Sequence, residues 1–104
     1  MITVVVQFDL REPVSAADAA KMFEQSAPRY ANLPGLVRKY FLRSEDGRKA
    51  GGVYLWETRA AAEKVYAGEW KDRVRALYGE PQMQWFDTPV IVDNASPAAG
   101  VRAA

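Results

Sequence analysis

The stretch that most constrains the fold is residues 33–57, which read LPGLVRKYFLRSEDGRKAGGVYLWE. Two runs rich in aliphatic and aromatic residues, 36–43 and 50–57, flank the dipeptide Asp46-Gly47. Because Asp and Gly tolerate the positive φ angles of a two-residue type I′ turn, this pattern predicts a β-hairpin.

The two-residue period of strands sorts the side chains of this hairpin onto two faces. In the predicted register Lys39 lies opposite Tyr54, and Val37 lies opposite Trp56. Both faces are largely apolar, so both need to be covered. One face carries Val37, Lys39, Phe41, Gly52, Tyr54 and Trp56, and the other carries Arg38, Tyr40, Leu42, Gly51, Val53 and Leu55.

Two helices are predicted outside the hairpin. Ser15 and Thr58 are suitable N-cap residues, because their hydroxyl oxygens can accept hydrogen bonds from N–H groups of the first helical turn. Apolar residues follow each cap at helical spacing. We expect Gly68 to interrupt the second helix and Gly79 to end it. The expected ion pairs on its surface are Glu69 with Arg73 and Asp72 with Arg75.

The remaining segments complete the fold class. Residues 2–10 and 82–92 are predicted strands, and Pro89 marks an edge or a bulge in the second. The order β-α-β-β-α-β is typical of a ferredoxin-like α+β fold with a four-stranded antiparallel sheet. We expect one domain over residues 1–94 and a flexible C-terminal tail over 95–104. Two helices cover only one face of this sheet, so the second apolar face predicts a homodimer.

Composition narrows the classes of function. The net charge is +1 and no block of like charge stands out, which argues against a nucleic-acid binder. The chain has no cysteine and no histidine, which removes the usual metal ligands, thiolate nucleophiles and neutral-pH bases. No apolar run approaches the roughly 18 residues of a membrane span. We therefore expect a cytoplasmic protein without a metal or cofactor.

Three segments resemble the YdhR-type monooxygenases, which are small dimeric α/β-barrel proteins related to the antibiotic-biosynthesis monooxygenases. The segments are residues 33–39 (LPGLVRK), residues 50–57 (AGGVYLWE) and Phe86-Asp87. The resemblance implies a cavity between the sheet and the helices of each subunit. It also implies that an aromatic residue, here Trp56, lines that cavity. The related enzymes have an asparagine at the position of Gly52, and the haem-degrading relatives use a histidine that this chain lacks.

The function implied by this resemblance is a cofactor-independent monooxygenase that acts with O₂ on a small aromatic or quinol compound. Such chemistry requires a site that binds the substrate anion, excludes water and stabilises negative charge. The candidate catalytic residues are Lys39, for electrostatic stabilisation, and Tyr54, for holding a phenolic oxygen or peroxide. The candidate substrate-binding residues are Gln7, Phe23, Phe41, Trp56 and Tyr66.

Each of these residues also has a structural interpretation. Trp56 and Tyr54 suit a packed core, and Lys39 can lie along an apolar surface with its ammonium group in water. Gly51-Gly52 lies inside a strand, which indicates close backbone approach, a bulge or cavity space rather than a phosphate loop. The alternative function is a non-catalytic dimeric barrel that binds a small apolar molecule or has a stress-related role.

Overall fold

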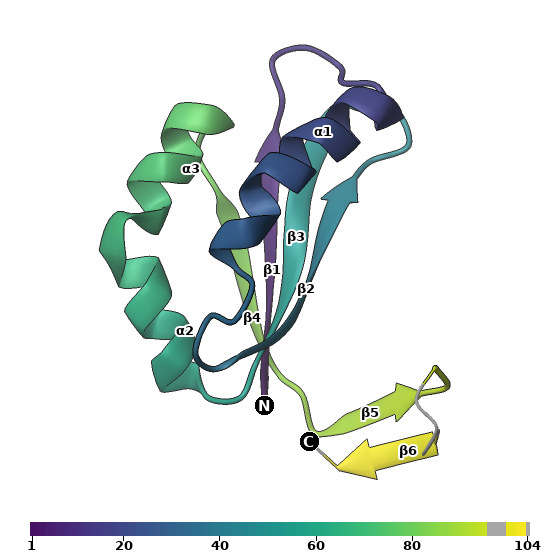
Figure 1. The fold of residues 1–104 in the computed structure, drawn as a ribbon, viewed down its shortest axis with the longest axis vertical. Coiled ribbons are helices and arrows are strands. Elements are labelled where there is room, and N and C mark those ends of the chain that lie inside the picture. The colour runs from purple at the N-terminus through teal and green to yellow at the C-terminus, as the bar shows by residue number, and fades with distance from the viewer. Residues whose placement is uncertain (96–99, 104) are drawn as a thin grey trace.

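The computed structural model describes residues 1–95 and 100–103. A layer of helices covers one face of the main sheet, and a small two-stranded sheet lies apart from it (Figure 1). The main sheet is antiparallel, with the strand order β2-β3-β1-β4. This arrangement confirms the ferredoxin-like α+β fold. The elements are β1 (Ile2–Asp9), α1 (Ala16–Ser26), η1 (Ala27–Arg29), β2 (Leu36–Arg43), β3 (Lys49–Trp56), α2 (Arg59–Val65), η2 (Tyr66–Trp70), α3 (Lys71–Leu77), β4 (Gln82–Asp87), β5 (Val90–Asp93) and β6 (Gly100–Ala103).

The helices begin and end where the sequence predicts. The Ser15 hydroxyl accepts a hydrogen bond from the Asp18 N–H at 3.1 Å, and the Thr58 hydroxyl accepts one from the Ala61 N–H at 3.1 Å. Gly68 has non-helical angles, φ −86° and ψ −145°, and divides the second helical segment within η2. Beyond α3, Gly79 adopts a φ of 115°, which suits the left-handed end of a helix.

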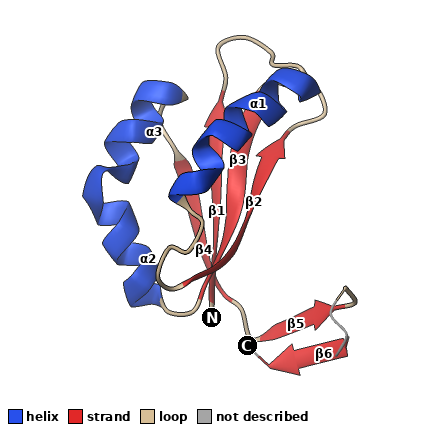
Figure 2. Ribbon diagram, viewed as in Figure 1, coloured by secondary structure: helices blue, strands red, loops and turns tan. Residues whose placement is uncertain are grey.

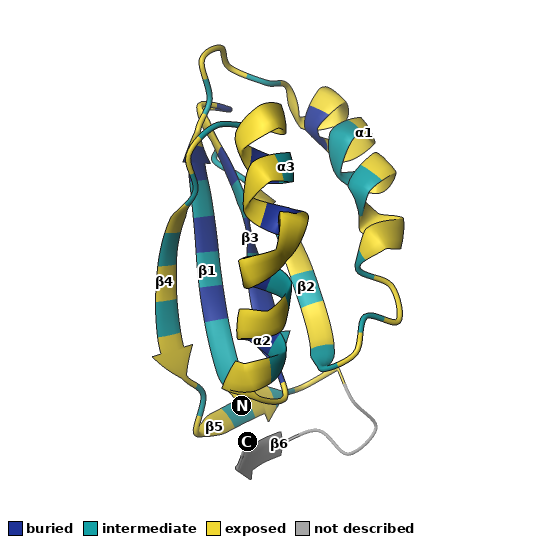
Figure 3. Cartoon of the chain, turned by 90° about the vertical axis from the view of Figure 1, so that its left-hand side faces the viewer, coloured by how far each residue is buried: buried dark blue, intermediate teal, exposed yellow. Residues whose placement is uncertain are grey.

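The hydrophobic core lies between the helices and one face of the sheet (Figures 2 and 3). Alternation along β1 and β3 turns every second side chain into this core. Trp56 is the largest of the fully buried side chains, with an exposed fraction of 0%. The other buried core residues are Val4, Val6, Phe8, Tyr54, Ala62, Tyr66, Trp70 and Val74.

Gly51 and Gly52, in β3, are glycines for two different structural reasons. A Cβ atom at position 51 would lie 1.9 Å from the carbonyl oxygen of Val6 on the neighbouring strand. A Cβ atom at position 52 would lie 3.1 Å from Cε of Lys39. Gly51 thus allows close backbone approach, and Gly52 leaves room for the Lys39 side chain, in agreement with the sequence interpretation.

Two details of the predicted hairpin are wrong. A bulge between Leu36 and Arg38 places Leu36, rather than Val37, opposite Trp56. Val37 consequently leaves the Trp56 face and is 42% exposed. Asp46 does not adopt a positive φ, so the turn is not type I′. Instead, the carbonyl group of residue 44 accepts a 2.9 Å hydrogen bond from the Gly47 N–H, and Gly47 takes the positive φ of 73°.

The predicted last strand, 82–92, is two strands. β4 pairs with β1 as far as Asp87, and the Thr88 N–H donates to the Met1 carbonyl at 3.0 Å. The chain then leaves the sheet at Pro89, and β5 pairs with β6 in a hairpin that extends from the body of the domain (Figure 1). Of the predicted flexible tail, residues 96–99 and 104 lie outside the described residues, and its flexibility remains a prediction.

The sheet face away from the helices stays uncovered by any described helix. Tyr40 and Leu42 on β2 are 52% and 42% exposed, and Phe86 on β4 is also exposed. Val53 and Leu55 continue this face on β3 and are half-buried. This confirms the predicted second apolar face; we call it the outer face.

Candidate functional site

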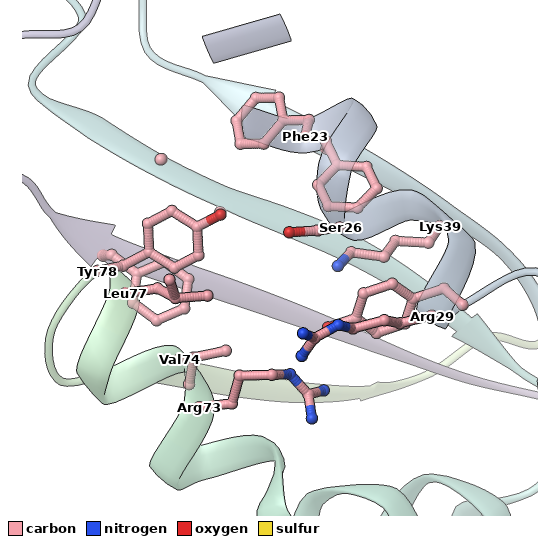
Figure 4. Close-up of a pocket in the computed structure, with 13 residues that line it drawn as sticks. Phe23, Ser26, Arg29, Lys39, Arg73, Val74, Leu77 and Tyr78 are labelled. Atoms are coloured by element: carbon pink, nitrogen blue, oxygen red, sulfur yellow. The ribbon is translucent and has the colours of Figure 1, made fainter. Parts of the chain in front are cut away.

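The candidate site is a cleft between the helical layer and the edge of the sheet formed by β2 and β3 (Figure 4). Its walls come from α1, η1 and α3, and its enclosed volume is about 30 Å³. The side chains that give it its chemical character are Phe23, Arg29, Tyr30, Lys39, Phe41 and Arg73.

Lys39 is enclosed by aromatic rings. Its Nζ atom lies 3.5 Å from the ring centroid of Tyr30, 3.8 Å from that of Phe41 and 4.4 Å from that of Tyr54. β2 directs Lys39 inward beside Tyr54, its partner across the strands. Gly52, with no side chain, leaves space for the lysine stem. We call Lys39 with Tyr30, Phe41 and Tyr54 the lysine cage.

The surroundings of Lys39 lower its pKa to near neutral pH. Burial, which disfavours the charged form, and the nearby charge of Arg73 lower its pKa from 10.5 to about 7. The negative faces of the aromatic rings attract the ammonium form and partly offset this effect. Lys39 can therefore take up or release a proton near neutral pH.

Two buried tyrosines, Tyr54 of the cage and Tyr66 behind it, remain protonated. Burial raises the pKa values of Tyr54 and Tyr66 above the ordinary value of 10. The Tyr66 hydroxyl accepts a hydrogen bond from the Trp56 indole N–H at 3.1 Å. The Trp70 indole N–H similarly donates to the Tyr30 hydroxyl at 3.2 Å. Tyr54 and Tyr66 therefore act as packing groups and not as bases, and Tyr66 and Tyr30 accept hydrogen bonds.

The structure brings together most of the site residues expected from the sequence. Phe23 and Phe41 stack with ring centroids 5.1 Å apart and line the cleft with Lys39, while Tyr54 forms part of its cage. Trp56 and Tyr66 pack behind Tyr54, with ring centroids 6.1 and 5.6 Å from it, but they do not line the cleft.

Gln7 requires a correction. In β1 it pairs with Gly51, whereas Val6 pairs with Gly52 and Val4 with Tyr54. Because paired residues share a face, Gln7 lies on the outer face and is separated from Lys39 by the sheet. The period of β1 separates Gln7 from Val4 and Val6, but only the pairing of β1 with β3 shows that Val4 and Val6 share the face of Tyr54.

Among the six side chains that give the cleft its chemical character, the sequence interpretation missed Arg29, Tyr30 and Arg73. Tyr30 follows η1 and supplies one ring of the lysine cage. The expected ion pair of Arg73 with Glu69 is absent from the ion pairs of the described residues, and Arg73 lines the cleft instead. The expected pair of Arg75 with Asp72 is present at 3.9 Å.

Within the described residues, no cluster of three or more acidic side chains could hold a metal ion. None of the described helices is both long and apolar enough to cross a membrane.

Together, the fold and the cleft define a ferredoxin-like α+β protein with an aromatic, lysine-containing cleft between sheet and helices. The family model "Putative mono-oxygenase ydhR" matches residues 3–86. The chain therefore belongs to this family. No curated protein matches the chain.

Solved structures confirm the fold of the chain. The ActVA-Orf6 monooxygenase of Streptomyces coelicolor, in complex with nanaomycin D, has 17% identity and a TM-score of 0.65, over 84% of this chain and 86% of that chain. SnoaB, a cofactor-independent oxygenase of Streptomyces nogalater, has 20% identity and a TM-score of 0.63, over 84% and 91%. A protein of Caulobacter crescentus CB15, described as a "putative antibiotic biosynthesis monooxygenase", has 22% identity and a TM-score of 0.62, over 84% and 88%. At these identities the similarity establishes the fold.

Proposed function

We propose that the protein is a cofactor-independent monooxygenase that oxidises a small phenolic or quinol compound with O₂. The observation that carries this proposal is the lysine cage, which places one titratable amine among aromatic surfaces in a cleft. Membership of the monooxygenase family agrees with this proposal.

Lys39 performs the first step in this account. Its neutral Nζ accepts the phenolic proton of the substrate, and the resulting ammonium group remains beside the phenolate. The low-dielectric surroundings strengthen that charge attraction. This arrangement extends the electrostatic role expected from the sequence, because the same side chain first removes the proton and then stabilises the anion.

The oxidation itself uses only the substrate and O₂. The phenolate transfers one electron to O₂, and the phenoxyl radical and superoxide combine at a free ring carbon. The Lys39 ammonium returns its proton to the peroxide, and loss of water across the C–H and O–O bonds leaves a quinone carbonyl. One oxygen atom of O₂ enters the product and the other leaves as water, so atoms and electrons balance.

Binding of a ring requires the cleft to widen. An enclosed volume of about 30 Å³ is far smaller than the roughly 300–1,000 Å³ typical of ligand pockets. Phe23 on α1 and Leu77 on α3 both line the cleft, and the two helices belong to separate parts of the helical layer (Figure 4). Outward movement of these side chains is the step that admits substrate in our proposal.

A non-catalytic binding protein is the second candidate. The observation that favours it is the state of Trp56, which is fully buried and donates its indole N–H to Tyr66. This aromatic residue, which the family resemblance assigns to the cavity wall, therefore has a structural role in the described structure.

A second copy of the chain is proposed to cover the outer face. Tyr40, Leu42 and Phe86 expose large apolar side chains on one continuous sheet surface. Contiguous exposed apolar surface of this kind typically marks an interaction site. Packing of sheet against sheet would bury it and leave the cleft, on the opposite side, accessible.

Oxygen uptake tests the proposed activity. Purified protein without added cofactor is incubated with 1-naphthol and with naphthohydroquinone, and O₂ consumption and quinone formation are followed together with ligand binding by calorimetry. We expect protein-dependent O₂ consumption matched by quinone formation. Tight binding without O₂ consumption above the protein-free rate would contradict the oxygenase and support the non-catalytic binding protein.

A further inference from the structure

The cleft holds more positive charge than the proposed reaction uses. Arg29, at the end of η1, and Arg73, on α3, line it together with Lys39 (Figure 4). None of the described Asp or Glu side chains lines the cleft. Arg29 is exposed and Arg73 is half-buried, so the two guanidinium groups lie toward its solvent side.

These two arginines also lack the ion pairs that Arg59 and Arg75 make. Among the ion pairs of the described residues, Arg75 pairs with Asp72 and Glu80, and Arg59 pairs with Glu63, but neither Arg29 nor Arg73 takes part. Arg73 instead lies close enough to Lys39 to disfavour its ammonium form. Like charges gathered on one concave surface are costly unless an anion neutralises them.

We propose that the mouth of the cleft binds a carboxylate group of the ligand between Arg29 and Arg73, while the phenolic ring of the same ligand contacts the lysine cage. The ligand class is thus an aromatic hydroxy acid. The position of the ring rests on the proposed function, but the carboxylate site rests on the arginines alone.

The chemistry of the two sites differs in a way that suits such a ligand. A guanidinium group is permanently charged and offers a planar pair of N–H donors that match the two oxygens of a carboxylate. The amine of Lys39 titrates and can exchange a proton with a phenol. The arginines would therefore fix the orientation of the ligand, and Lys39 would act on its hydroxyl group.

A matched pair of probes tests this site by binding alone. 1-Hydroxy-2-naphthoate and 1-naphthol differ only in the carboxylate, and their dissociation constants are measured by calorimetry at low ionic strength without oxygen. We expect the acid to bind at least tenfold more tightly than 1-naphthol. Arg73→Gln and Arg29→Gln should each reduce that preference several-fold. Arg29→Gln should leave the affinity for 1-naphthol nearly unchanged.

Arg75→Gln is the control, because Arg75 lies on the same helix but pairs with Glu80 at 2.7 Å. It should keep the full preference for the acid. Arg29 is exposed, so Arg29→Gln remains informative if Arg73→Gln fails to fold. Equal affinity of the wild-type protein for both probes, no binding of either probe, or a full preference retained by both arginine variants would overturn the proposal.

The outcome for the carboxylate site is independent of the outcome for the proposed oxygenase activity. If the protein prefers the acid through its arginines but consumes no O₂, the carboxylate site is supported and the oxygenase activity is contradicted. If the protein oxidises 1-naphthol but shows no preference for the acid, the oxygenase activity is supported and the carboxylate site is contradicted.

Discussion

The Nζ atom of Lys39, on β2, lies 3.5 Å from the ring centroid of Tyr30, which follows η1. The Tyr30 hydroxyl in turn accepts a hydrogen bond from Trp70 of η2. One lysine of the sheet is thereby held against both parts of the helical layer. This contact couples the protonation of Lys39 to the packing of the fold, and the first prediction follows from it.

Lys39 should make stability depend on pH between about 7 and 10.5. Below a pH of about 7, the pKa of Lys39 in the folded protein, Lys39 is charged in both the folded and the unfolded chain. The free energy of unfolding is then lowered by the full cost of burying that charge. Between 7 and 10.5 the unfolded chain keeps a proton that the folded chain releases, so the free energy of unfolding rises with pH. Above 10.5 the effect is complete.

Thermal unfolding of wild type and Lys39→Met at a series of pH values checks this expectation. The melting temperature of the wild type, relative to the variant, should rise across this window. Lys49→Met, which removes an exposed lysine of the same sheet, is the control. Parallel curves for wild type and Lys39→Met would show that Lys39 titrates with its ordinary pKa.

The buried hydrogen bond from Trp56 to Tyr66 should contribute to stability. Tyr66→Phe leaves the Trp56 indole N–H without its acceptor in the core, at a cost of about 1–3 kcal/mol. In a Trp56→Phe background the same change should cost much less, because the donor is gone. Chemical denaturation of the four proteins in this double-mutant cycle gives the coupling energy; a value near zero contradicts the contact.

Gly51 and Gly52 should differ in their tolerance of a methyl group. Gly51→Ala places Cβ against the backbone of β1 and should cost at least about 3 kcal/mol or prevent folding. Gly52→Ala, which meets the Tyr40 carbonyl at 3.0 Å and the movable Lys39 stem, should cost less. Gly68→Ala meets no atom within 4 Å and serves as the reference. Denaturation midpoints measure the order, and equal values for Gly51→Ala and Gly68→Ala would be inconsistent with the strand packing.

The outer face should hold two subunits together. Tyr40→Asp puts a charge on that face, where burial without a partner costs several kcal/mol. We expect the wild type to sediment as a dimer at micromolar concentration and Tyr40→Asp as a monomer. Ala67 is an exposed residue of η2, so the Ala67→Asp variant should remain dimeric. A wild-type chain that sediments as a stable monomer would remove the basis for the proposed dimer.

Much of the fold could be predicted because its signals are local. Ser15 and Thr58 cap helices through their own hydroxyl groups, and Gly68 interrupts a helix through its own backbone angles. The bulge that moves Val37 could not be predicted in this way, since it depends on how two strands pair. The departure of the chain from the sheet after Thr88 likewise depends on the pairing of β5 with β6.

The site was harder to predict because it depends on distant contacts. The strand period grouped Lys39 with Tyr54 on one face of the hairpin, and the family resemblance at Trp56 identified that face as the one toward the cavity. Its enclosure by Tyr30 depends on the path of the chain through η1, and its proximity to Arg73 depends on the packing of α3 over the sheet. Gln7 was placed wrongly since the pairing of β1 with β3, and not the period of β1, decides which face it shares.

The most direct test of the proposed function is the pH dependence of kcat/KM for O₂-dependent oxidation of 1-naphthol, in wild type and Lys39→Met. We expect the wild-type value to rise with pH to a plateau, with a midpoint near 7, as Lys39 loses its proton. Lys39→Met should lower kcat/KM by about 10²–10⁴-fold and lose that midpoint, whereas Lys49→Met should keep both rate and profile. If Lys39→Met oxidises 1-naphthol at the wild-type rate with the wild-type midpoint, Lys39 is not the base and the proposed mechanism is contradicted.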